Sequence, residues 1–135
     1  MSSLVGFSIF HGLSGLNERW AQDAQLRALG YYKHLICQTI EIGQTKLAVW
    51  GHPELSECLH WLPDGDLLVL IGSPHNKVPW STIEEGLLKA THLEEYDLPW
   101  DGRVILLRVS ADGMRWRMWN DWIGSIPVYH AQIGG

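Results

Sequence analysis

The chain is poor in cysteine and has no long apolar run, and each shortage removes a class of protein. Its two cysteines, Cys37 and Cys58, form neither a C-x-x-C pair nor a dense framework, which favours reduced thiols in a cytoplasmic protein over disulfide bonds. No run approaches about 18 apolar residues, and the apolar start of the chain has no basic residue before it. The sequence therefore predicts neither a membrane span nor an export signal.

Positive charge is also scarce. Ten Lys and Arg residues are scattered among 15 Asp and Glu, which gives a formal net charge of −5. Nucleic-acid-binding proteins gather their basic residues on one face, so no DNA or RNA partner is expected. What the chain does have is 46% hydrophobic residues and eight Trp in 135 residues, enough for the packed core of one domain spanning residues 1–135.

Apolar periodicity predicts strands and two helices. The expected strands are 4–10, 35–42, 47–50 and 114–119. Asn17 is the expected N-cap of a helix at 17–29 that Gly30 ends, and Ser81 and Glu84 form a capping box for a helix at 81–92. Gly43-Gln44 and Asp112-Gly113 are expected hairpin turns, and the acidic segment 94–97 is an expected solvated loop.

Residues 120–130 combine a polar turn, a Gly, a Pro and an apolar pair, which predicts a turn leading into a strand. This stretch resembles the Arg-Asp-Pro-Leu-Gly-Ile-Arg-Pro-Leu-Tyr-Tyr segment of the glutamine-hydrolysing domain in the asparagine synthetase family. Four residues match: Asp121, Gly124, Pro127 and Tyr129. Those domains are class II glutamine amidotransferases with an N-terminal-nucleophile fold. The resemblance implies an α+β fold, an αββα sandwich of antiparallel sheets.

A second stretch, residues 47–56, resembles the family's strand followed by Gly-His-Arg-Arg-Leu-Ser. The matching residues are Gly51, His52, Leu55 and Ser56. In the family the second Arg of this motif binds the α-carboxylate of glutamine. Glu54 stands at that position here, and its carboxylate repels the group that a guanidinium would hold in a bidentate pair.

Residues 103–110 resemble the family's Gly-x-Phe-Ala strand, which is buried on both faces. Residues 66–76 resemble a strand leading into the family's Asn-Gly-Glu-Ile-Tyr-Asn motif, with matches at Gly72 and Asn76. In the family the first Asn and the following Gly form the oxyanion hole. This chain has Ile71 at the Asn position and Ser73 at the Glu position. Removing one preorganised donor typically costs a factor of about 10² to 10³ in rate. The resemblance thus implies a degenerate substrate pocket at Glu54 and these four residues.

The family's nucleophile is an N-terminal Cys, uncovered by Met removal, whose own α-amino group acts as the base. Ser2 occupies that position here, and Asn120 and Ile126 replace two Arg of the last motif. The expected result is a domain without a catalytic residue and without glutaminase activity. An amidohydrolase that uses Ser2 as its nucleophile stays open as an alternative.

Two other kinds of site have candidate residues in the sequence. The candidate zinc ligands are His52, Cys58 and His60, but their spacing matches no common zinc site, so no metal is predicted. A small peptide-binding module is a further alternative, built on Trp116, Trp119 and Trp122. Residues of this type more often belong to a core or an interface.

The resemblance implies a supporting role beside an asparagine-synthetase-like ligase half, in cis or as a separate chain. β-Lactam synthetases and lasso-peptide cyclases have such degenerate domains and form an amide without glutamine-derived ammonia. ATP and magnesium are expected only in that partner, because this chain lacks a Ser-Gly-Gly-x-Asp-Ser phosphate loop. The partner is expected at the Trp-rich end of the chain and an open sheet edge, and a homo-oligomer stays open. The family continues beyond Gly135, so a truncated sandwich is expected, as a stand-alone protein or an N-terminal piece.

Overall fold

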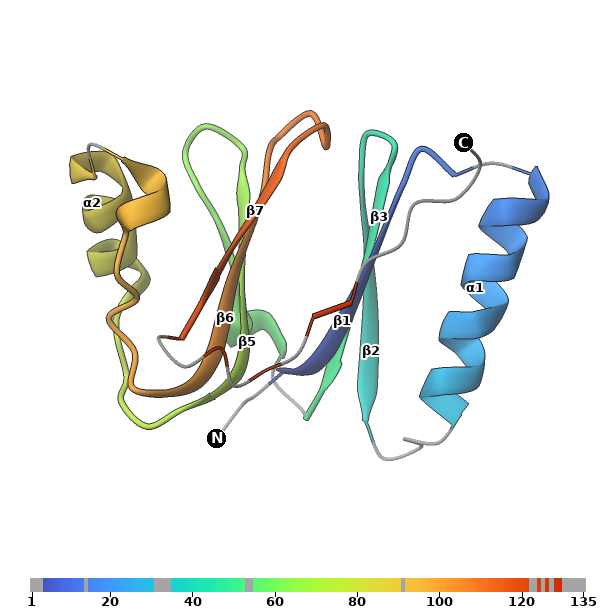
Figure 1. Ribbon diagram of the computed structural model, residues 1–135, viewed down its shortest axis with the longest axis horizontal. Coiled ribbons are helices and arrows are strands. Elements are labelled where there is room, and N and C mark those ends of the chain that lie inside the picture. The colour runs from blue at the N-terminus through green and yellow to red at the C-terminus, as the bar shows by residue number, and fades with distance from the viewer. Residues whose placement is uncertain are drawn as a thin grey trace.

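The computed structural model describes residues 4–13, 15–30, 35–52, 55–90, 92–121, 124, 126, 128 and 129. Two antiparallel sheets face each other in this part of the chain, and one helix lies on the outer side of each sheet (Figure 1). The strand orders are β1-β3-β2 in the three-stranded sheet and β4-β5-β6-β7 in the four-stranded sheet. The predicted mixture of helices and two antiparallel sheets is confirmed. No helix among the described residues is long and apolar enough to cross a membrane.

The three-stranded sheet contains β1 (Leu4–His11), β2 (Ile36–Ile42) and β3 (Thr45–Gly51). The four-stranded sheet contains β4 (Leu59–Trp61), β5 (Leu67–Pro74), β6 (Gly102–Val109) and β7 (Trp116–Asn120). The helices are α1 (Gly15–Gly30) and α2 (Trp80–Lys89), with 3-10 turns η1 (Leu55–Cys58) and η2 (Leu93–Glu95). The first strand, the β2–β3 hairpin, β5 and β6 lie where the sequence predicts them.

Both predicted helix starts are wrong. Asn17 lies inside α1, which begins two residues earlier at Gly15. Ser81 is inside α2, whose N-cap is Pro79, with no side-chain hydrogen bond to the helix start. The helix also ends at Lys89 rather than at residue 92, and Glu94 and Glu95 form η2 instead of a loop. Proline at the cap holds the chain extended without a capping side chain, which explains the earlier start.

The strand expected in residues 120–130 is also wrong for the residues that the structure describes. Asp121, Gly124, Val128 and Tyr129 lie outside any strand or helix, and Ile126 lies in a bend. Ile126 and Val128 nevertheless pack against the core between the sheets. Their burial explains the apolar pattern that suggested a strand.

The core between the two sheets follows from the alternation of side chains along each strand. The three-stranded sheet contributes Leu4, Ile42, Leu47 and Val49. The four-stranded sheet contributes Leu67, Val69, Ile71, Ile105, Leu107 and Val109. Each fully buried aliphatic side chain of this kind stabilises the fold by about 1.5–3 kcal/mol.

The intervening residues of β5 and β6 point to the opposite face and pack under α2. This second core holds Leu68, Ile83, Leu87, Trp100, Val104, Leu106 and Trp119. The indole Nε1 of Trp119 donates to the carbonyl oxygen of Leu93 at 2.7 Å, which fastens η2 to β7. Because β5 and β6 are covered on both faces, their sequences are apolar almost throughout.

One end of the sandwich is closed by contacts between two hairpins. The hydroxyl of Thr45, at the start of β3, donates to the carbonyl oxygen of Gly113 in the β6–β7 turn at 2.5 Å. Nδ1 of His11 lies 2.8 Å from the same hydroxyl oxygen. We call this the hairpin end. At the opposite end, the N-terminal end, β1 begins at Leu4 and β3 finishes at Gly51.

Candidate functional site

Ile71 lies in β5, in the half that leads to the N-terminal end, where the resemblance expects an oxyanion donor. Its side chain is 1% exposed and belongs to the core between the sheets, together with Leu4. It pairs with Ile105 of β6. An aliphatic side chain in this core offers no hydrogen-bond donor, so position 71 contributes packing.

Gly72 follows in β5 and has a φ of +108°, a conformation that side chains other than glycine rarely adopt. A Cβ at this position would overlap the carbonyl oxygen of Arg103 and approach Cδ1 of Ile126 to 3.0 Å. The match between this glycine and the family motif therefore has a structural cause. Ile126, which belongs to the last of the three resembling stretches, therefore lies against Gly72 of β5.

Asn76 uses its side-chain amide to hold the loop that precedes β6. Its Oδ1 accepts from the backbone N–H of Asp101 at 2.7 Å, and its Nδ2 donates to the carbonyl oxygen of Pro99 at 3.0 Å. The neighbouring His75 N–H donates to the carbonyl oxygen of Asp101 at 2.7 Å. Ser73, by contrast, is exposed at the end of β5. The amide of Asn76 is thus engaged at both of its ends by the protein.

We expect Asn76→Ala to lower the free energy of unfolding by about 1–3 kcal/mol, because it leaves backbone groups of Pro99 and Asp101 without their partner. Urea denaturation followed by tryptophan fluorescence measures the change. Asn120→Ala is the matched control, since Asn120 is exposed on β7. Equal loss of stability in the two variants would remove the structural role assigned to Asn76.

Two matched residues of the second stretch, Gly51 and His52, lie at the end of β3. Gly51 is the last residue of β3 and pairs with both Leu4 of β1 and Ile36 of β2. His52, directly after it, is exposed. Two of the residues that the sequence assigns to this site, Ser2 and Glu54, lie outside the described residues.

Asp121 follows β7 and is bonded twice to Val104. Its N–H donates to the carbonyl oxygen of Val104 at 3.1 Å, and its Oδ2 accepts from the N–H of Val104 at 3.3 Å. Gly124 has a φ of +64°, and its N–H donates to the carbonyl oxygen of Asp121 at 2.9 Å, which forms a turn. Tyr129 is 89% exposed, and Pro127 lies outside the described residues.

Cys58 is a nucleophilic side chain near the start of β1. The backbone of Leu4 forms a hydrogen bond with its thiol. Burial is the main influence on this group and raises the pKa of Cys58 above its usual value. A protonated, buried thiol is a poor nucleophile.

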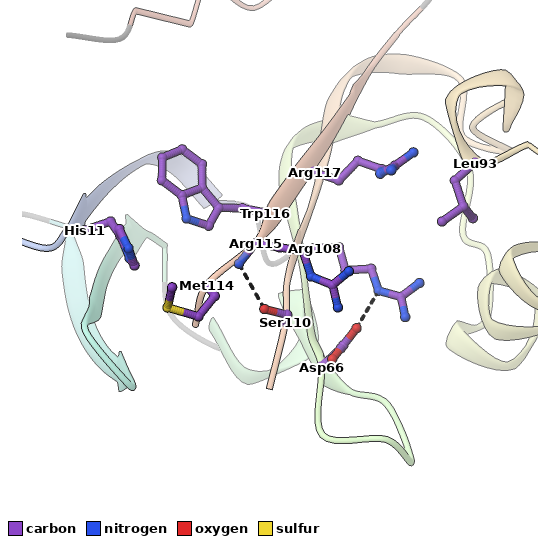
Figure 2. Close-up of a pocket in the computed structure, with 9 residues that line it drawn as sticks. All are labelled: His11, Asp66, Leu93, Arg108, Ser110, Met114, Arg115, Trp116 and Arg117. Atoms are coloured by element: carbon purple, nitrogen blue, oxygen red, sulfur yellow. Dashed lines mark hydrogen bonds and ion pairs between the residues drawn. The ribbon is translucent and has the colours of Figure 1, made fainter. Parts of the chain in front are cut away.

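A cavity of about 520 Å³ opens at the hairpin end, away from the predicted site (Figure 2). Its lining residues are His11, Asp66, Leu93, Arg108, Ser110, Met114, Arg115, Trp116 and Arg117. Three of them are arginines, which suggests an anion site. No sequence pattern indicates this cavity, because its residues come from segments far apart in the chain.

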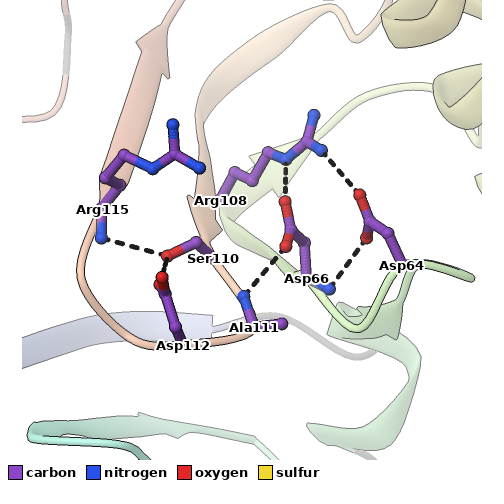
Figure 3. Close-up of polar contacts among 7 residues, drawn as sticks. All are labelled: Asp64, Asp66, Arg108, Ser110, Ala111, Asp112 and Arg115. Carbon is purple, nitrogen blue, oxygen red and sulfur yellow. Dashed lines mark hydrogen bonds and ion pairs between the residues drawn. The ribbon is translucent and has the colours of Figure 1, made fainter.

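One of the three arginines, Arg108, is paired with carboxylates within the protein (Figure 3). Nε of Arg108 lies 2.8 Å from Oδ2 of Asp66, and an Nη of the same guanidinium lies 3.3 Å from Oδ2 of Asp64. Hydrogen bonds from the Ser110 hydroxyl and the Met114 N–H hold the pKa of Asp112 below its usual value. The charge of Arg108 is therefore compensated by two aspartates, so this arginine does not offer its charge to a ligand.

His60, considered above as a metal ligand, is paired with a carboxylate instead. Its Nε2 bonds to Oε1 of Glu84 on α2, and its ring stacks on Trp80 with ring centroids 5.2 Å apart. Among the described residues, no group of three or more His, Cys, Asp or Glu is placed to hold a metal ion. Glu84, expected in a capping box, thus ties α2 to β4.

Comparisons with known proteins add no relative, because no family model, no curated protein and no solved structure matches this chain. Function is therefore inferred from the three resembling stretches and from the geometry described above.

Proposed function

We propose that this chain is a non-catalytic amidotransferase-like domain of the N-terminal-nucleophile architecture. It supports an asparagine-synthetase-like, ATP-dependent ligase that forms an amide bond, as in β-lactam synthetases or lasso-peptide cyclases. The ligase half supplies the ATP and magnesium sites. We place the pair in the cytoplasm, which suits two unpaired cysteines.

The layer order supports this proposal. Two antiparallel sheets lie between α1 and α2, as the N-terminal-nucleophile fold requires (Figure 1). The first strand begins at Leu4, whose side chain is buried between the sheets with Ile71 of β5. The start of β1 therefore lies near the β5 motif, as in an amidotransferase domain.

One observation carries the proposal: Ile71 lies in the apolar core directly beside Gly72, whose φ is +108°. The glycine stands at the position of the glycine in the family's oxyanion motif. The neighbouring isoleucine removes the donor that would stabilise a tetrahedral intermediate. A domain of this fold without the catalytic donor would act through its interactions with a partner.

Co-expression with the neighbouring ligase tests the proposal. We expect a chain with a Ser-Gly-Gly-x-Asp-Ser phosphate loop to be encoded beside this one and to elute with it as a stoichiometric complex. The purified domain, incubated with glutamine, is expected to release no ammonia above the buffer rate. Independent elution of the two chains, or the absence of such a ligase, would overturn the proposal.

The same purified protein can be used to test the alternative in which Ser2 is a nucleophile. That reaction needs a free α-amino group on Ser2, which exists only after Met1 is removed. Mass spectrometry of the intact protein determines which residue is first. Steady release of ammonia from an amide substrate, abolished by Ser2→Ala, would favour the hydrolase over the scaffold.

A further inference from the structure

β7 forms an open edge of the four-stranded sheet, since β6 is its only strand partner among the described residues. The N–H of Ser110 donates to the carbonyl oxygen of Arg115 at 2.9 Å, and that of Asp121 to the carbonyl oxygen of Val104 at 3.1 Å. Bonded positions alternate along an antiparallel pair, so the odd-numbered residues of β7 bond to β6. The even-numbered ones direct their N–H and C=O groups to the open edge: Trp116, Met118 and Asn120.

The two faces of this edge strand differ in chemistry. Trp116 and Met118 pair with Val109 and Leu107, which point into the core between the sheets. The side chains of Trp116 and Met118 therefore lie on that face, yet they are 44% and 37% exposed. Met114, in the turn before β7, is 59% exposed. A strip of apolar surface thus runs beside unpaired backbone groups.

Arginines occupy the opposite face of β7. Arg117 pairs with Arg108 across the sheet, but Arg108 is bound by two aspartates. The carboxylate beside Arg117 belongs to Glu94, whose side chain is 72% exposed and 3.5 Å away, so solvent screens this pair. Arg115 precedes Arg117 by two residues and extends the positive face toward the hairpin turn (Figure 2). Asp112, whose pKa Arg115 helps to lower, is exposed, so solvent screens that attraction as well. Arg115 and Arg117 are therefore open to a carboxylate from a new neighbouring strand.

We infer that the open edge of β7 binds an extended segment of a partner protein in which acidic and apolar side chains alternate. Its backbone continues the sheet beyond β7, its acidic side chains lie beside Arg115 and Arg117, and its apolar side chains cover Trp116 and Met118. The inference rests on the proposed function, because it names the surface that holds the partner. Backbone hydrogen bonds supply affinity in such strand addition, and alternate side chains supply specificity.

Charge selects this partner over a second copy of the chain. Opposite charges across neighbouring strands stabilise a pair, whereas like charges destabilise it. A two-fold antiparallel pairing centred on Arg117 would set Arg117 against its own copy. Centring it on Met118 sets Arg115 against Asp121, whose Oδ2 already accepts from Val104. A segment with alternating acidic and apolar residues places no arginine against Arg117 and brings its own carboxylates to Arg115.

Two synthetic peptides test the inference, one alternating Glu and Val over about nine residues, the length of a long strand, and one alternating Lys and Val. Isothermal titration calorimetry with the intact chain is expected to show binding of the Glu peptide and at least tenfold weaker binding of the Lys peptide. Arg117→Glu is expected to reverse that order. Arg27→Glu, on the exposed face of α1, is the matched charge reversal and is expected to leave both affinities unchanged.

A second variant separates backbone pairing from charge. Met118→Pro removes an N–H that points to the open edge and leaves the bonds to β6 in place, and edge strands tolerate proline. We expect it to abolish binding of both peptides while circular dichroism stays that of the parent protein. Should Met118→Pro unfold the chain, Arg117→Glu still decides the question.

The inference is overturned if neither peptide binds, if the two bind equally, or if Arg117→Glu leaves the preference unchanged. Concentration-dependent self-association that Arg117→Glu weakens would identify a second copy as the occupant instead. Association with the ligase that Arg117→Glu does not weaken would overturn the inference and leave the proposed function in place. Peptide binding at β7 without any ligase association would support binding at this edge and overturn the proposed function.

Discussion

Gly72→Ala is expected to lower the free energy of unfolding by about 3 kcal/mol or more. The residue has a φ of +108°, and an added Cβ would overlap the backbone carbonyl oxygen of Arg103 in the paired strand. Neither atom can move without breaking the β5–β6 ladder, which lies between both cores. Strain of this kind belongs to the mechanisms that give the largest effects of single substitutions.

The control for this variant is another glycine with positive φ and free space. Gly12 has a φ of +64°, and a Cβ added at that position would meet no atom within 4 Å. Gly12→Ala is therefore expected to cost only about 1 kcal/mol, the conformational penalty alone. Urea unfolding of both variants gives the difference. Equal costs would mean that Arg103 does not confine Gly72.

Ile71→Asn introduces the residue type that the asparagine synthetase family has at the corresponding position of the resembling motif, and we expect it to lower the free energy of unfolding by about 3–5 kcal/mol. The substitution removes a fully buried aliphatic side chain and places an amide in an apolar core. No glutaminase activity is expected from it. Thermal or urea unfolding and an ammonia-release assay with glutamine measure the two quantities.

Ile71→Val is the matched conservative change, with an expected cost of about 0.5–1.5 kcal/mol. This substitution shortens the side chain without adding a polar group, and so tests whether position 71 is tightly packed. If Ile71→Asn folds as stably as Ile71→Val and hydrolyses glutamine, position 71 faces a working pocket. The interpretation of this site as a packed core would then be wrong.

Sequence patterns predict the strands that are long and apolar and miss the short strand β4, which is recognised only by its pairing with β5. β5 and β6 are buried on both faces, and their unbroken apolar runs mark them. β4 has only three residues, which is too short for any periodicity to appear. The capping box misplaces the start of α2 because Ser81 has the right chemistry, whereas Pro79 fixes the backbone one residue before the helix.

The candidate site is predictable where the backbone itself dictates the residue. Gly72 is identified by its motif, and its positive φ explains why a glycine stands there. The role of Asn76 is not predictable, because its partners Pro99 and Asp101 are 23 and 25 residues away and meet it only in the folded chain. The ion pair between Arg108 and Asp66 spans 42 residues and is hidden for the same reason.

The rate of amide formation by the ligase that we propose as the partner, measured with and without this chain, tests the central claim most directly. We predict that adding the chain raises ATP-dependent amide formation in the absence of glutamine. We also predict that Ser2→Ala supports the ligase as well as the parent chain does. A ligase that is indifferent to the chain, or one that depends on ammonia released by Ser2, would contradict the supporting role proposed for this domain.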